Sequence, residues 1–348
     1  MNTVRNIALV GAGVIGKHHG LVIGQLADRL RLTAVVDIDP ERAQRLAAER
    51  GGTPFTSLAD ALSTVDVDIV AVCTPTGRHG EVAIEALAAG KNVIVEKPAE
   101  ITVERTDEII EAQRKAGTVV TVISQHRFDP ATETMLAAIE RDELGRLTSG
   151  IASIDWWRGQ SYYDSGDWRG TWELDGGGAL MNQGVHTVDL LVAALGRPVE
   201  VFAYTGTLAH QRIEVEDVAV GVVRFESGAL GVLHATTSAY PGLSARLQVH
   251  GDKGSVVIDN DQLVFLETTA PGGEAKEQSY GATSARAVPT AGSDPGQLSD
   301  AHRLQYLNFL GALDGTDRLR VDLETNRQSI GVITGVYESA RTGRPVTL

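Results

Sequence analysis

A glycine triad directly after an apolar run of residues constrains this chain more than any other feature of its sequence. Gly11, Gly13 and Gly16 follow the predicted strand Asn6–Val10 and open a helical pattern. The first glycine permits a tight turn, the second lets the backbone approach a pyrophosphate, and the third allows the helix to pack closely on the strand. The N-terminus of that helix then presents unpaired N–H groups to the phosphates. The pattern predicts a dinucleotide site lined by Gly11, Gly13, Val14, Ile15 and Gly16.

An acidic residue at the end of the second predicted strand indicates which dinucleotide this site binds. Asp37 ends the run Leu32–Asp37, about 20 positions after the triad, where a carboxylate accepts hydrogen bonds from the adenosine ribose. The same carboxylate repels a 2′-phosphate, and no arginine directly follows it to bind such a group. We therefore predict NAD rather than NADP as the cofactor, with Ile38 beside the adenosine.

The order of predicted strands and helices divides the chain into two domains. Short β-rich runs alternate with helical stretches up to Ser124, which predicts a doubly wound parallel sheet covered on both faces, a Rossmann fold. From Glu200 to about Leu266 strand follows strand, separated by turn residues, which predicts a large, mainly antiparallel open sheet. We expect an α/β Rossmann domain over residues 1–124 and an α+β domain for substrate binding and oligomerisation over residues 125–348.

The closing part of the chain is predicted to contain two helices and a segment rich in small residues. The helices are predicted at Leu298–Leu313 and Leu323–Thr342, and the second is able to pack back on the first domain. Residues 268–297 are rich in Gly, Ala, Ser, Thr and Pro. A segment of this length without regular structure is typically a lid, an arm or disordered chain.

Composition and charge exclude several classes of partner. The chain has 31 Lys and Arg residues against 45 Asp and Glu, which gives a formal net charge of −14. Nucleic acids and anionic membranes attract basic faces, so neither is expected as a partner. No apolar run approaches the roughly 18 to 20 residues that span a bilayer, and the N-terminus lacks a signal-peptide cleavage site. We expect a cytoplasmic protein without a metal site, in which the lone Cys73 is a buried small hydrophobe.

Four motifs along the chain are similar to those of one enzyme family. They are residues 11–20, residues 73–79, the run Val95-Glu96-Lys97-Pro98, and residues 176–189. Together with the closing residues 337–348 they make the whole chain resemble the Gfo/Idh/MocA family of sugar and polyol oxidoreductases. The cofactor-binding residues that this resemblance implies, besides those at the triad, are Thr74, Pro75, Thr76, His79, Glu96, Lys97, Trp168 and Arg169.

The position of Lys97 supports a catalytic role on physical grounds as well. It lies at the C-terminal end of a predicted parallel strand, where open α/β sheets place their ligands. Pro98 favours an extended conformation at Lys97 and fixes the direction of the chain there. A lysine that is partly desolvated and near other cations has its pKa lowered towards the range useful for proton transfer. The alternative is a surface lysine with a solvated ammonium group.

A predicted helix in the second domain carries Asn182, His186 and Asp189. The first two are four residues apart, which places them on one helical face, and Asp189 lies one further turn along, where it could orient the imidazole. The resemblance implies that His186 is catalytic together with Lys97. Inositol-type members usually carry aspartate at the position of Asn182, and an amide cannot accept a proton. The version of the motif with asparagine resembles that of members that oxidise C3 of a pyranose, including nucleotide-sugar 3-dehydrogenases.

Aromatic residues cluster shortly before that helix, with three of the four tryptophans at positions 156, 157 and 168. Aromatic faces with polar tips suit a sugar ring, which has apolar C–H patches and a rim of hydroxyl groups. Ordinary packing between the two domains is the alternative interpretation. The substrate-binding residues that we predict are Asn182, Asp189, Gln125, Arg127, Trp157, Arg158, Tyr163 and His302.

These residues favour an NAD-dependent dehydrogenase that oxidises a secondary hydroxyl of a cyclic polyol or sugar, such as an inositol, a pyranose or an anhydrosugar. Lys97, aided by His186, would take the hydroxyl proton as hydride leaves the same carbon for nicotinamide C4. The alternatives are a nucleotide-sugar 3-dehydrogenase, a glycoside hydrolase of this fold that retains NAD, and a non-catalytic dinucleotide sensor. By analogy with the family we expect a homodimer or homotetramer.

Overall fold

The computed structural model describes residues 3–269 and 295–348 and contains two compact units. Each unit combines segments that are distant in the sequence, whereas two consecutive domains divided between residues 124 and 125 were expected. That division stays a prediction. Most of the segment 268–297 lies outside the described residues. The first unit consists of Met1–Gln125, Trp172–Gly176 and Ser293–Ile330, and the second consists of His126–Thr171, Gly177–Gly292 and Gly331–Leu348.

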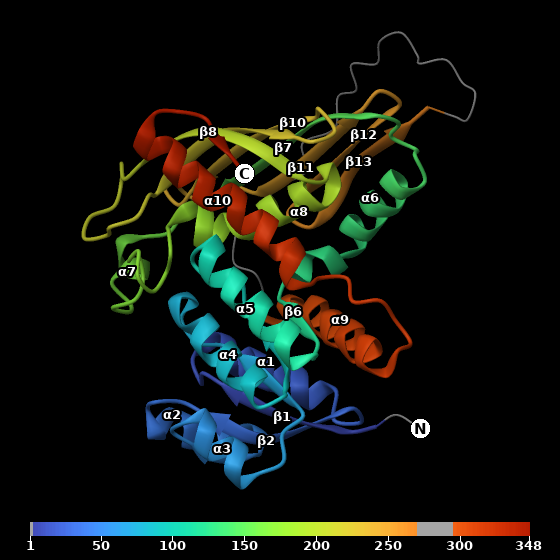
Figure 1. The fold of residues 1–348 in the computed structure, drawn as a ribbon. Coiled ribbons are helices and arrows are strands. Elements are labelled where there is room, and N and C mark those ends of the chain that lie inside the picture. The colour runs from blue at the N-terminus through green and yellow to red at the C-terminus, as the bar shows by residue number, and fades with distance from the viewer. Residues whose placement is uncertain (1–2, 270–294) are drawn as a thin grey trace. The chain divides into compact units, whose positions relative to one another are not determined.

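In the described residues, the first unit is built on a six-stranded parallel sheet of order β3-β2-β1-β4-β5-β6 (Figure 1). This arrangement confirms the predicted parallel sheet. The strands are β1 (Arg5–Val10), β2 (Leu30–Val36), β3 (Thr53–Phe55), β4 (Ile69–Val72), β5 (Asn92–Val95) and β6 (Val120–Val122). The helices are α1 (Val14–Gln25), α2 (Pro40–Arg50), α3 (Leu58–Thr64), η1 (Thr76–Arg78), α4 (His79–Ala88), α5 (Val103–Ala116) and α9 (Pro295–Asp314).

Both faces of this sheet are covered by helices. Successive side chains of a strand point to opposite faces. Ala8 and Val10 of β1 therefore pack in one apolar cluster, with residues of α3, α4 and α5. Ile7 and Leu9 pack in a second cluster, with residues of α1, α2 and α9. The parallel strands all end at the same edge, so the loops that follow them gather there.

Three elements of the first unit differ from the sequence-based prediction. The short β3 and α3 have no counterpart in it, because three residues that include Pro54 are too few to show an alternating pattern. Ser57, whose hydroxyl accepts a hydrogen bond from the backbone N–H of Asp60, is the local signal for the start of α3. The helix α9 was expected in the second domain, but it packs in the cluster with α1 and α2.

In the described residues, the second unit is built on an eight-stranded sheet of order β13-β12-β11-β7-β10-β9-β8-β14. All its strand pairs are antiparallel except β7 with β10, which confirms the large, mainly antiparallel sheet. The strands are β7 (Leu147–Asp155), β8 (Pro198–Gly206), β9 (Val218–Phe225), β10 (Leu230–Thr236), β11 (Ala245–Gly251), β12 (Gly254–Asp259), β13 (Gln262–Thr268) and β14 (Val346–Thr347). The helical segments are η2 (Gln125–Phe128), α6 (Pro130–Glu140), α7 (Gln160–Tyr163), η3 (Ala179–Gly184), α8 (Val185–Leu195) and α10 (Leu323–Thr342), of which η2 and α10 have residues in both units.

The two faces of the eight-stranded sheet differ in how they are covered. Residues of α6, α8 and α10 pack against one face and form the apolar core of this unit. On the other face, β9 alternates buried and exposed residues, and its exposed positions include Val220 and Val222. Antiparallel sheets commonly leave one face to solvent, but that face is usually polar.

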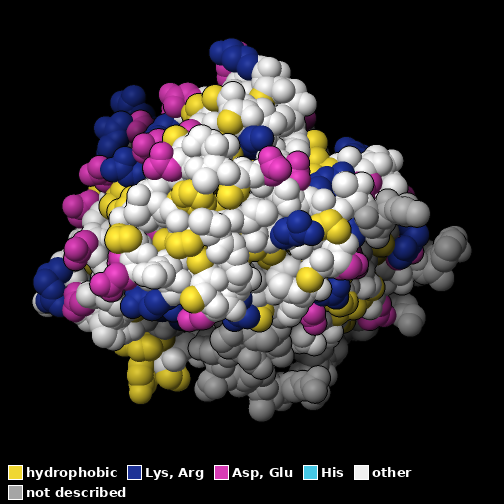
Figure 2. Space-filling view, turned by 90° about the horizontal axis from the view of Figure 1, so that it is seen from below, with side chains coloured by type: hydrophobic (Ala, Val, Ile, Leu, Met, Phe, Trp, Pro, Cys, Tyr) yellow, Lys and Arg dark blue, Asp and Glu magenta, His cyan; other side chains and the backbone are white. Residues whose placement is uncertain are grey.

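Charged side chains of both signs lie on the surface, and the lone cysteine is buried. Figure 2 shows one face of the molecule, on which basic and acidic side chains are interspersed and apolar ones form small separate groups. Cys73 is free and buried, as predicted, and burial raises the pKa of its thiol well above the usual range. Among the described helices, none has the length and apolar character needed to cross a membrane.

Candidate active site

The glycine triad adopts the backbone geometry that the sequence predicts for a phosphate-binding loop. Gly11 has a φ of +101°, and a Cβ atom there would lie 2.4 Å from the carbonyl oxygen of Cys73. A Cβ atom at Gly16 would lie 1.8 Å from the carbonyl oxygen of Gly11, so α1 can start this close to the strand only with glycine there. A Cβ atom at Gly13 would meet nothing within 4 Å. The space beside Gly13 is open to a ligand, as a pyrophosphate requires.

The loop after β2 places Asp37 next to the glycine loop. Its carboxylate accepts hydrogen bonds from the backbone N–H of Ala12, at 2.7 Å, and from that of Asp39, at 2.9 Å. These bonds fix the carboxylate and leave further lone pairs for ribose hydroxyl groups. Two large apolar side chains nearby are left in water, since Val14 is 86% exposed and Ile38 is 93% exposed. A bound adenosine would cover apolar surface of this kind, and the residues present therefore fit NAD.

The loop after β4 is held by a buried histidine. The ring nitrogens of His79 lie 2.9 Å from the carbonyl oxygen of Thr74 and 2.8 Å from that of Pro98. This histidine therefore connects the loop after β4 with the loop after β5. The hydroxyl oxygen of Thr74 is buried and has no hydrogen-bond partner in the described residues, and Thr76 is buried as well. An orphaned buried hydroxyl at this edge of the sheet is a group that a ligand would satisfy.

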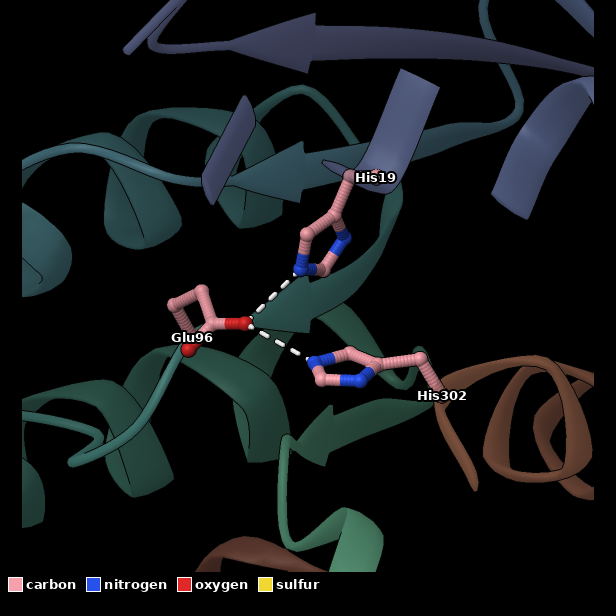
Figure 3. A group of neighbouring side chains, drawn as sticks. All are labelled: His19, Glu96 and His302. Atoms are coloured by element: carbon pink, nitrogen blue, oxygen red, sulfur yellow. Dashed lines mark hydrogen bonds and ion pairs between the residues drawn. The ribbon is translucent and has the colours of Figure 1, made fainter. Parts of the chain in front are cut away.

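Lys97 lies directly after β5, at the edge of the sheet where the glycine loop and Asp37 also lie. It is partly buried, and its backbone N–H donates to the carboxylate of Glu96 at 3.0 Å. Glu96 itself is buried, and its other carboxylate oxygen lies 2.7 Å from Nε2 of His19 and 3.6 Å from Nε2 of His302 (Figure 3). The hydroxyl of Tyr306 lies 2.6 Å from Nδ1 of His19. Glu96 thus joins β5 to helices α1 and α9.

The protonation states in this cluster follow from burial and hydrogen bonding. Burial alone would raise the pKa of Glu96, but hydrogen bonds from His19 and His302 outweigh burial and hold that pKa well below its usual range. Burial lowers the pKa of His19 despite the opposing bond to Glu96. Burial also raises the pKa of Tyr306, so its hydroxyl stays protonated and donates to Nδ1 of His19. A neutral His19 then donates its Nε2–H to the Glu96 carboxylate.

Two clusters could hold a metal ion by the criterion of distance alone, although the sequence predicted no such site. Among the described residues, they are His19 with Glu96 and His302, and His126 with Asp129 and Asp261. The members come from different elements, so no spacing in the sequence could have indicated them. In the first cluster the hydrogen bonds described above already satisfy the ligand atoms of His19 and Glu96. The expectation that the protein has no metal site remains a prediction.

The segment that carries Asn182 is π-helical rather than α-helical. It is η3, which leads directly into α8. The prediction that Asn182 and His186 share one face assumed α-helical spacing, which holds only from Val185 onward. π-Helical turns are rare and occur frequently at functional sites.

A buried carboxylate, which no sequence pattern indicated, holds the start of this π-helical segment. The side chain of Glu216 accepts hydrogen bonds from the backbone N–H groups of Gly178 and Leu180, both at 2.8 Å. Its backbone carbonyl accepts from Ala179, and the hydroxyl of Tyr337 accepts from Met181 at 3.2 Å. The N–H groups that a helix start leaves unpaired are therefore all satisfied. Burial raises the pKa of Glu216 to about 7.

An ion pair that the sequence did not predict connects two of the expected substrate-binding residues. Arg127 donates to both carboxylate oxygens of Asp189, at 2.6 and 2.7 Å, and both side chains are buried. This pair fixes η2 against α8. The ring of His186 on α8 packs edge-on against His126, with ring centroids 4.9 Å apart. Besides this pair, the suggestion that Asp189 orients His186 stays a prediction.

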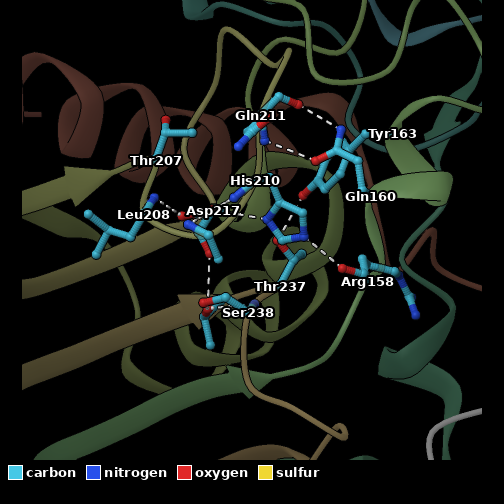
Figure 4. Close-up of polar contacts among 12 residues, drawn as sticks. Arg158, Gln160, Tyr163, Thr207, Leu208, His210, Gln211, Asp217, Thr237 and Ser238 are labelled. Carbon is cyan, nitrogen blue, oxygen red and sulfur yellow. Dashed lines mark hydrogen bonds and ion pairs between the residues drawn. The ribbon is translucent and has the colours of Figure 1, made fainter.

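The predicted aromatic cluster is present in the second unit, and a buried hydrogen-bond network supports it (Figure 4). The hydroxyl of Tyr163 lies 2.7 Å from Oγ1 of Thr237, and its ring packs against His210. His210 in turn lies 3.0 Å from the carboxylate of Asp217. Trp157 is partly exposed, and its ring lies 5.4 Å from that of Tyr240.

The structure thus places the expected site residues in both units. The cofactor residues Gly11, Gly13, Gly16, Asp37 and Lys97 gather at one edge of the first sheet. Gln125 and His302, both predicted to bind the substrate, also belong to the first unit and are buried there. The remaining expected substrate residues, together with Trp168 and Arg169, belong to the second unit. The roles predicted for all these residues stay predictions.

The acid sensitivity of the first unit tests the protonation states at Glu96. Because the folded-state pKa of His19 lies below its ordinary value of 6.5, His19 contributes stability that is present above pH 6.5 and is lost as the pH falls. We expect His19→Gln to be less stable at pH 7 and to lose less stability than the wild type between pH 6.5 and 5. One proton accounts for a slope of at most about 1.4 kcal/mol per pH unit. The measurement is the denaturant midpoint as a function of pH.

His234→Gln is the matched control for this experiment. A bond to Asp155 raises the pKa of His234, so its contribution to stability is lost as the pH rises and has the opposite sign. The control should therefore keep the full loss of stability in acid. An acid slope in His19→Gln equal to that of the wild type would contradict the assignment.

Comparison with known proteins agrees with the geometry of both units. Residues 5–124 match the family model of an oxidoreductase family with an NAD-binding Rossmann fold, and residues 132–257 match the GFO/IDH/MocA C-terminal domain. Inositol 2-dehydrogenase from Rhizobium meliloti (strain 1021) is 30% identical over 272 residues, which cover 76% of this chain and 78% of that protein. 1,5-Anhydro-D-fructose reductase from Ensifer adhaerens is 31% identical over 260 residues, which cover 72% of this chain and 75% of that protein.

A solved structure is similar over nearly the whole chain. It is the WlbA dehydrogenase from Bordetella pertussis in complex with NADH and UDP-GlcNAcA, at 33% sequence identity and a TM-score of 0.87. The similarity covers 99% of this chain and 99% of that one.

Proposed function

The chain belongs to the Gfo/Idh/MocA family of NAD-binding oxidoreductases, and from this membership we propose that it oxidises a secondary hydroxyl group of a sugar or cyclic polyol. The observation that carries the proposal is the position of Lys97, directly after β5 at the edge of the sheet where the glycine loop and Asp37 lie. The similar proteins named for inositol and anhydrofructose support this class of substrate.

Each group of the first unit has one proposed role. Bound NAD supplies the hydride acceptor of the reaction. The backbone around Gly13 receives the pyrophosphate, and Asp37 accepts hydrogen bonds from the ribose hydroxyl groups. Nζ of Lys97 takes the proton of the substrate hydroxyl as the C–H bond of the same carbon breaks. Glu96 holds the backbone of Lys97 and does not itself exchange a proton, because its low pKa keeps it ionised.

The second unit is proposed to supply the groups that bind and orient the sugar. His186 assists the proton transfer, and Asn182 donates to and accepts from sugar hydroxyl groups. The Glu216 carboxylate and the pair of Arg127 with Asp189 hold the backbone that carries these two residues.

A nucleotide-linked sugar is the second candidate substrate. With asparagine at position 182, the motif resembles that of family members that oxidise C3 of a pyranose. The similarity to the WlbA dehydrogenase, whose solved complex contains UDP-GlcNAcA, supports the same candidate. A panel of inositols, free sugars, anhydrosugars and nucleotide sugars, assayed for NADH formation, separates the two candidates. A hydrolase that retains NAD would release free sugar from a glycoside without net NADH, and a sensor would turn over none of these compounds.

We further propose that two copies of the chain associate through the exposed face of the eight-stranded sheet. The strand register places Phe202, Val222, Val232 and Ile151 in one row across β8, β9, β10 and β7. Val222 and Val232 are exposed. Covering this apolar row removes it from water and gives a homodimer, or a homotetramer if a second surface joins two dimers.

Loss of turnover in a lysine variant tests the catalytic assignment. We expect Lys97→Met to lower kcat by about 10²- to 10⁴-fold, the range that a positioned acid–base group contributes. The affinity for NAD should change little, because the glycine loop and Asp37 are untouched. Initial rates of NADH formation and a titration with NAD measure the two quantities.

Lys115→Met is the matched control for the lysine variant. Lys115 is an exposed lysine near the end of α5, paired with Glu111, so its replacement should leave kcat unchanged. A Lys97→Met enzyme that keeps a kcat near the wild-type value would overturn the role of Lys97.

The association state of an arginine variant tests the proposed interface. Val222→Arg places a charge in the apolar row, and we expect it to shift the protein to a monomer in sedimentation or light-scattering experiments. Leu304→Arg, which replaces an exposed leucine of α9, is expected to keep the wild-type state. A monomeric wild type, or an oligomer that survives Val222→Arg, would refute the proposal.

A further inference from the structure

Two arginines of the second unit stack on one tyrosine ring. The guanidinium carbon of Arg158 lies 5.4 Å from the ring centroid of Tyr162 and 5.1 Å from that of Trp156. The guanidinium carbon of Arg169 lies 4.3 Å from the centroid of Tyr162 and 4.4 Å from that of Trp168. Both arginines are partly buried. Two like charges are therefore held near one aromatic ring.

Neither of these guanidinium groups has a carboxylate within ion-pair distance among the described residues. The chain has 45 acidic residues and a net charge of −14, so carboxylates are not scarce. Other arginines of the same unit are paired, as Arg127 is with Asp189 and Arg212 with Asp164. Two partly buried cations without a counter-charge repel each other, and an anion between or beside them would relieve that repulsion.

The hydrogen bonds of Arg158 leave part of its guanidinium group unused. Its Nη2 donates to Oε1 of Gln183 at 2.9 Å, whereas its Nε is buried and has no hydrogen-bond partner in the described residues. Buried polar atoms in proteins are nearly always hydrogen-bonded, and an exception calls for a ligand or a water molecule. The guanidinium fork matches a carboxylate or phosphate, which can accept two of its N–H groups side by side.

Arg158 is also fixed in place by buried contacts of its backbone. Its carbonyl oxygen accepts a hydrogen bond from Nε2 of His210 at 2.7 Å, and its N–H donates to the carbonyl of Thr237 at 2.8 Å. His210 is itself held by the buried Asp217. Figure 4 shows the side chain of Arg158 pointing away from this network. The backbone is thus rigid while the guanidinium group remains available.

A short chain of hydrogen bonds connects Arg158 to a residue of the proposed substrate site. The amide of Gln183 accepts from Arg158 and donates to Oδ1 of Asn182 at 2.9 Å and to the hydroxyl of Tyr162 at 3.0 Å. All these residues belong to the second unit. An anion bound by Arg158 would therefore lie one side chain away from the asparagine proposed to contact the sugar.

We propose that Arg158 binds an anionic group of the substrate, either a carboxylate or a phosphate. The proposal rests on the proposed function, because it names the class of sugar that the same site takes: an acidic or phosphate-bearing sugar rather than a neutral one. Arg158 is the principal contact, because it has the unused buried N–H group and the connection to Asn182. Arg169, which the family resemblance assigns to the cofactor, adds a second positive charge next to the ring of Tyr162.

Direct binding to the NADH-loaded protein tests this proposal without requiring turnover. The probes for calorimetry are glucose, glucuronate, uridine diphosphate and uridine diphosphate glucose. We expect at least one anionic probe to bind about 10- to 100-fold more tightly than glucose, the range of a charge-assisted hydrogen bond. Tight binding of glucuronate assigns the group as a carboxylate, and tight binding of uridine diphosphate assigns it as a phosphate. Binding of all anionic probes no tighter than glucose would overturn the proposal.

Arginine variants test whether Arg158 makes the contact. We expect Arg158→Gln to remove the preference for the anionic probe while leaving glucose and NADH binding unchanged, and Arg158→Lys to retain part of it. Arg212→Gln, which changes an exposed arginine of the same unit, is the control and should bind like the wild type. Equal weakening of every probe would assign Arg158 to folding alone, and weakened NADH binding would assign the anion to the cofactor. Either result contradicts the proposal.

Two further outcomes remain decisive. If Arg158→Gln does not fold, the contact is tested by comparing the wild type with Arg158→Lys. A lysine keeps the positive charge but lacks the paired N–H groups of the guanidinium, so this variant should retain only part of the preference for the anionic probe. If an anionic probe binds as expected but no sugar of the panel yields NADH, the binding site stands and the proposed function fails.

Discussion

The buried carboxylate of Glu96 joins three parts of the first unit that are far apart in the sequence. One oxygen binds His19 of α1 and lies near His302 of α9, and the other accepts the backbone N–H of Lys97. A buried charge is tolerated only where such partners surround it. The helix that starts at the glycine loop and the loop that carries Lys97 are therefore held by one group. The position of Lys97, on which the proposed chemistry depends, is fixed by this contact.

The second unit uses the same physical device at a different place. Glu216 is buried and satisfies the N–H groups at the start of the π-helical segment, while Arg127 and Asp189 form a buried pair that fixes α8. Removing one partner of either contact would leave an uncompensated buried polar group, which is more costly than the bond itself. In both units the residues proposed to meet ligands therefore sit on backbone that buried carboxylates hold. The guanidinium groups of Arg158 and Arg169 differ, because no carboxylate of the described residues lies within ion-pair distance of them.

Much of the fold could be predicted because it depends on local patterns. The glycine triad, Asp37 and the position of Lys97 follow from residues that are close in sequence and from the rule that parallel strands end at one edge. The contacts of Glu96 could not be predicted, since residues 19, 96 and 302 meet only in the folded unit. The sequence pattern predicted one regular helix through Asn182, whereas that residue lies in a π-helix, and the shared face of Asn182 and His186 stays a prediction. The stacking of two arginines on Tyr162 depends likewise on the path of the chain, which no spacing reveals.

The central claim is that hydride passes from a sugar carbon to NAD. It is tested most directly with the sugar or polyol that the panel selects, deuterated at the carbon to be oxidised and incubated with NAD and the enzyme. The account predicts one deuterium at C4 of the reduced nicotinamide for each keto sugar formed, and a slower rate with the deuterated compound. Formation of product without deuterium in the nicotinamide would contradict the account.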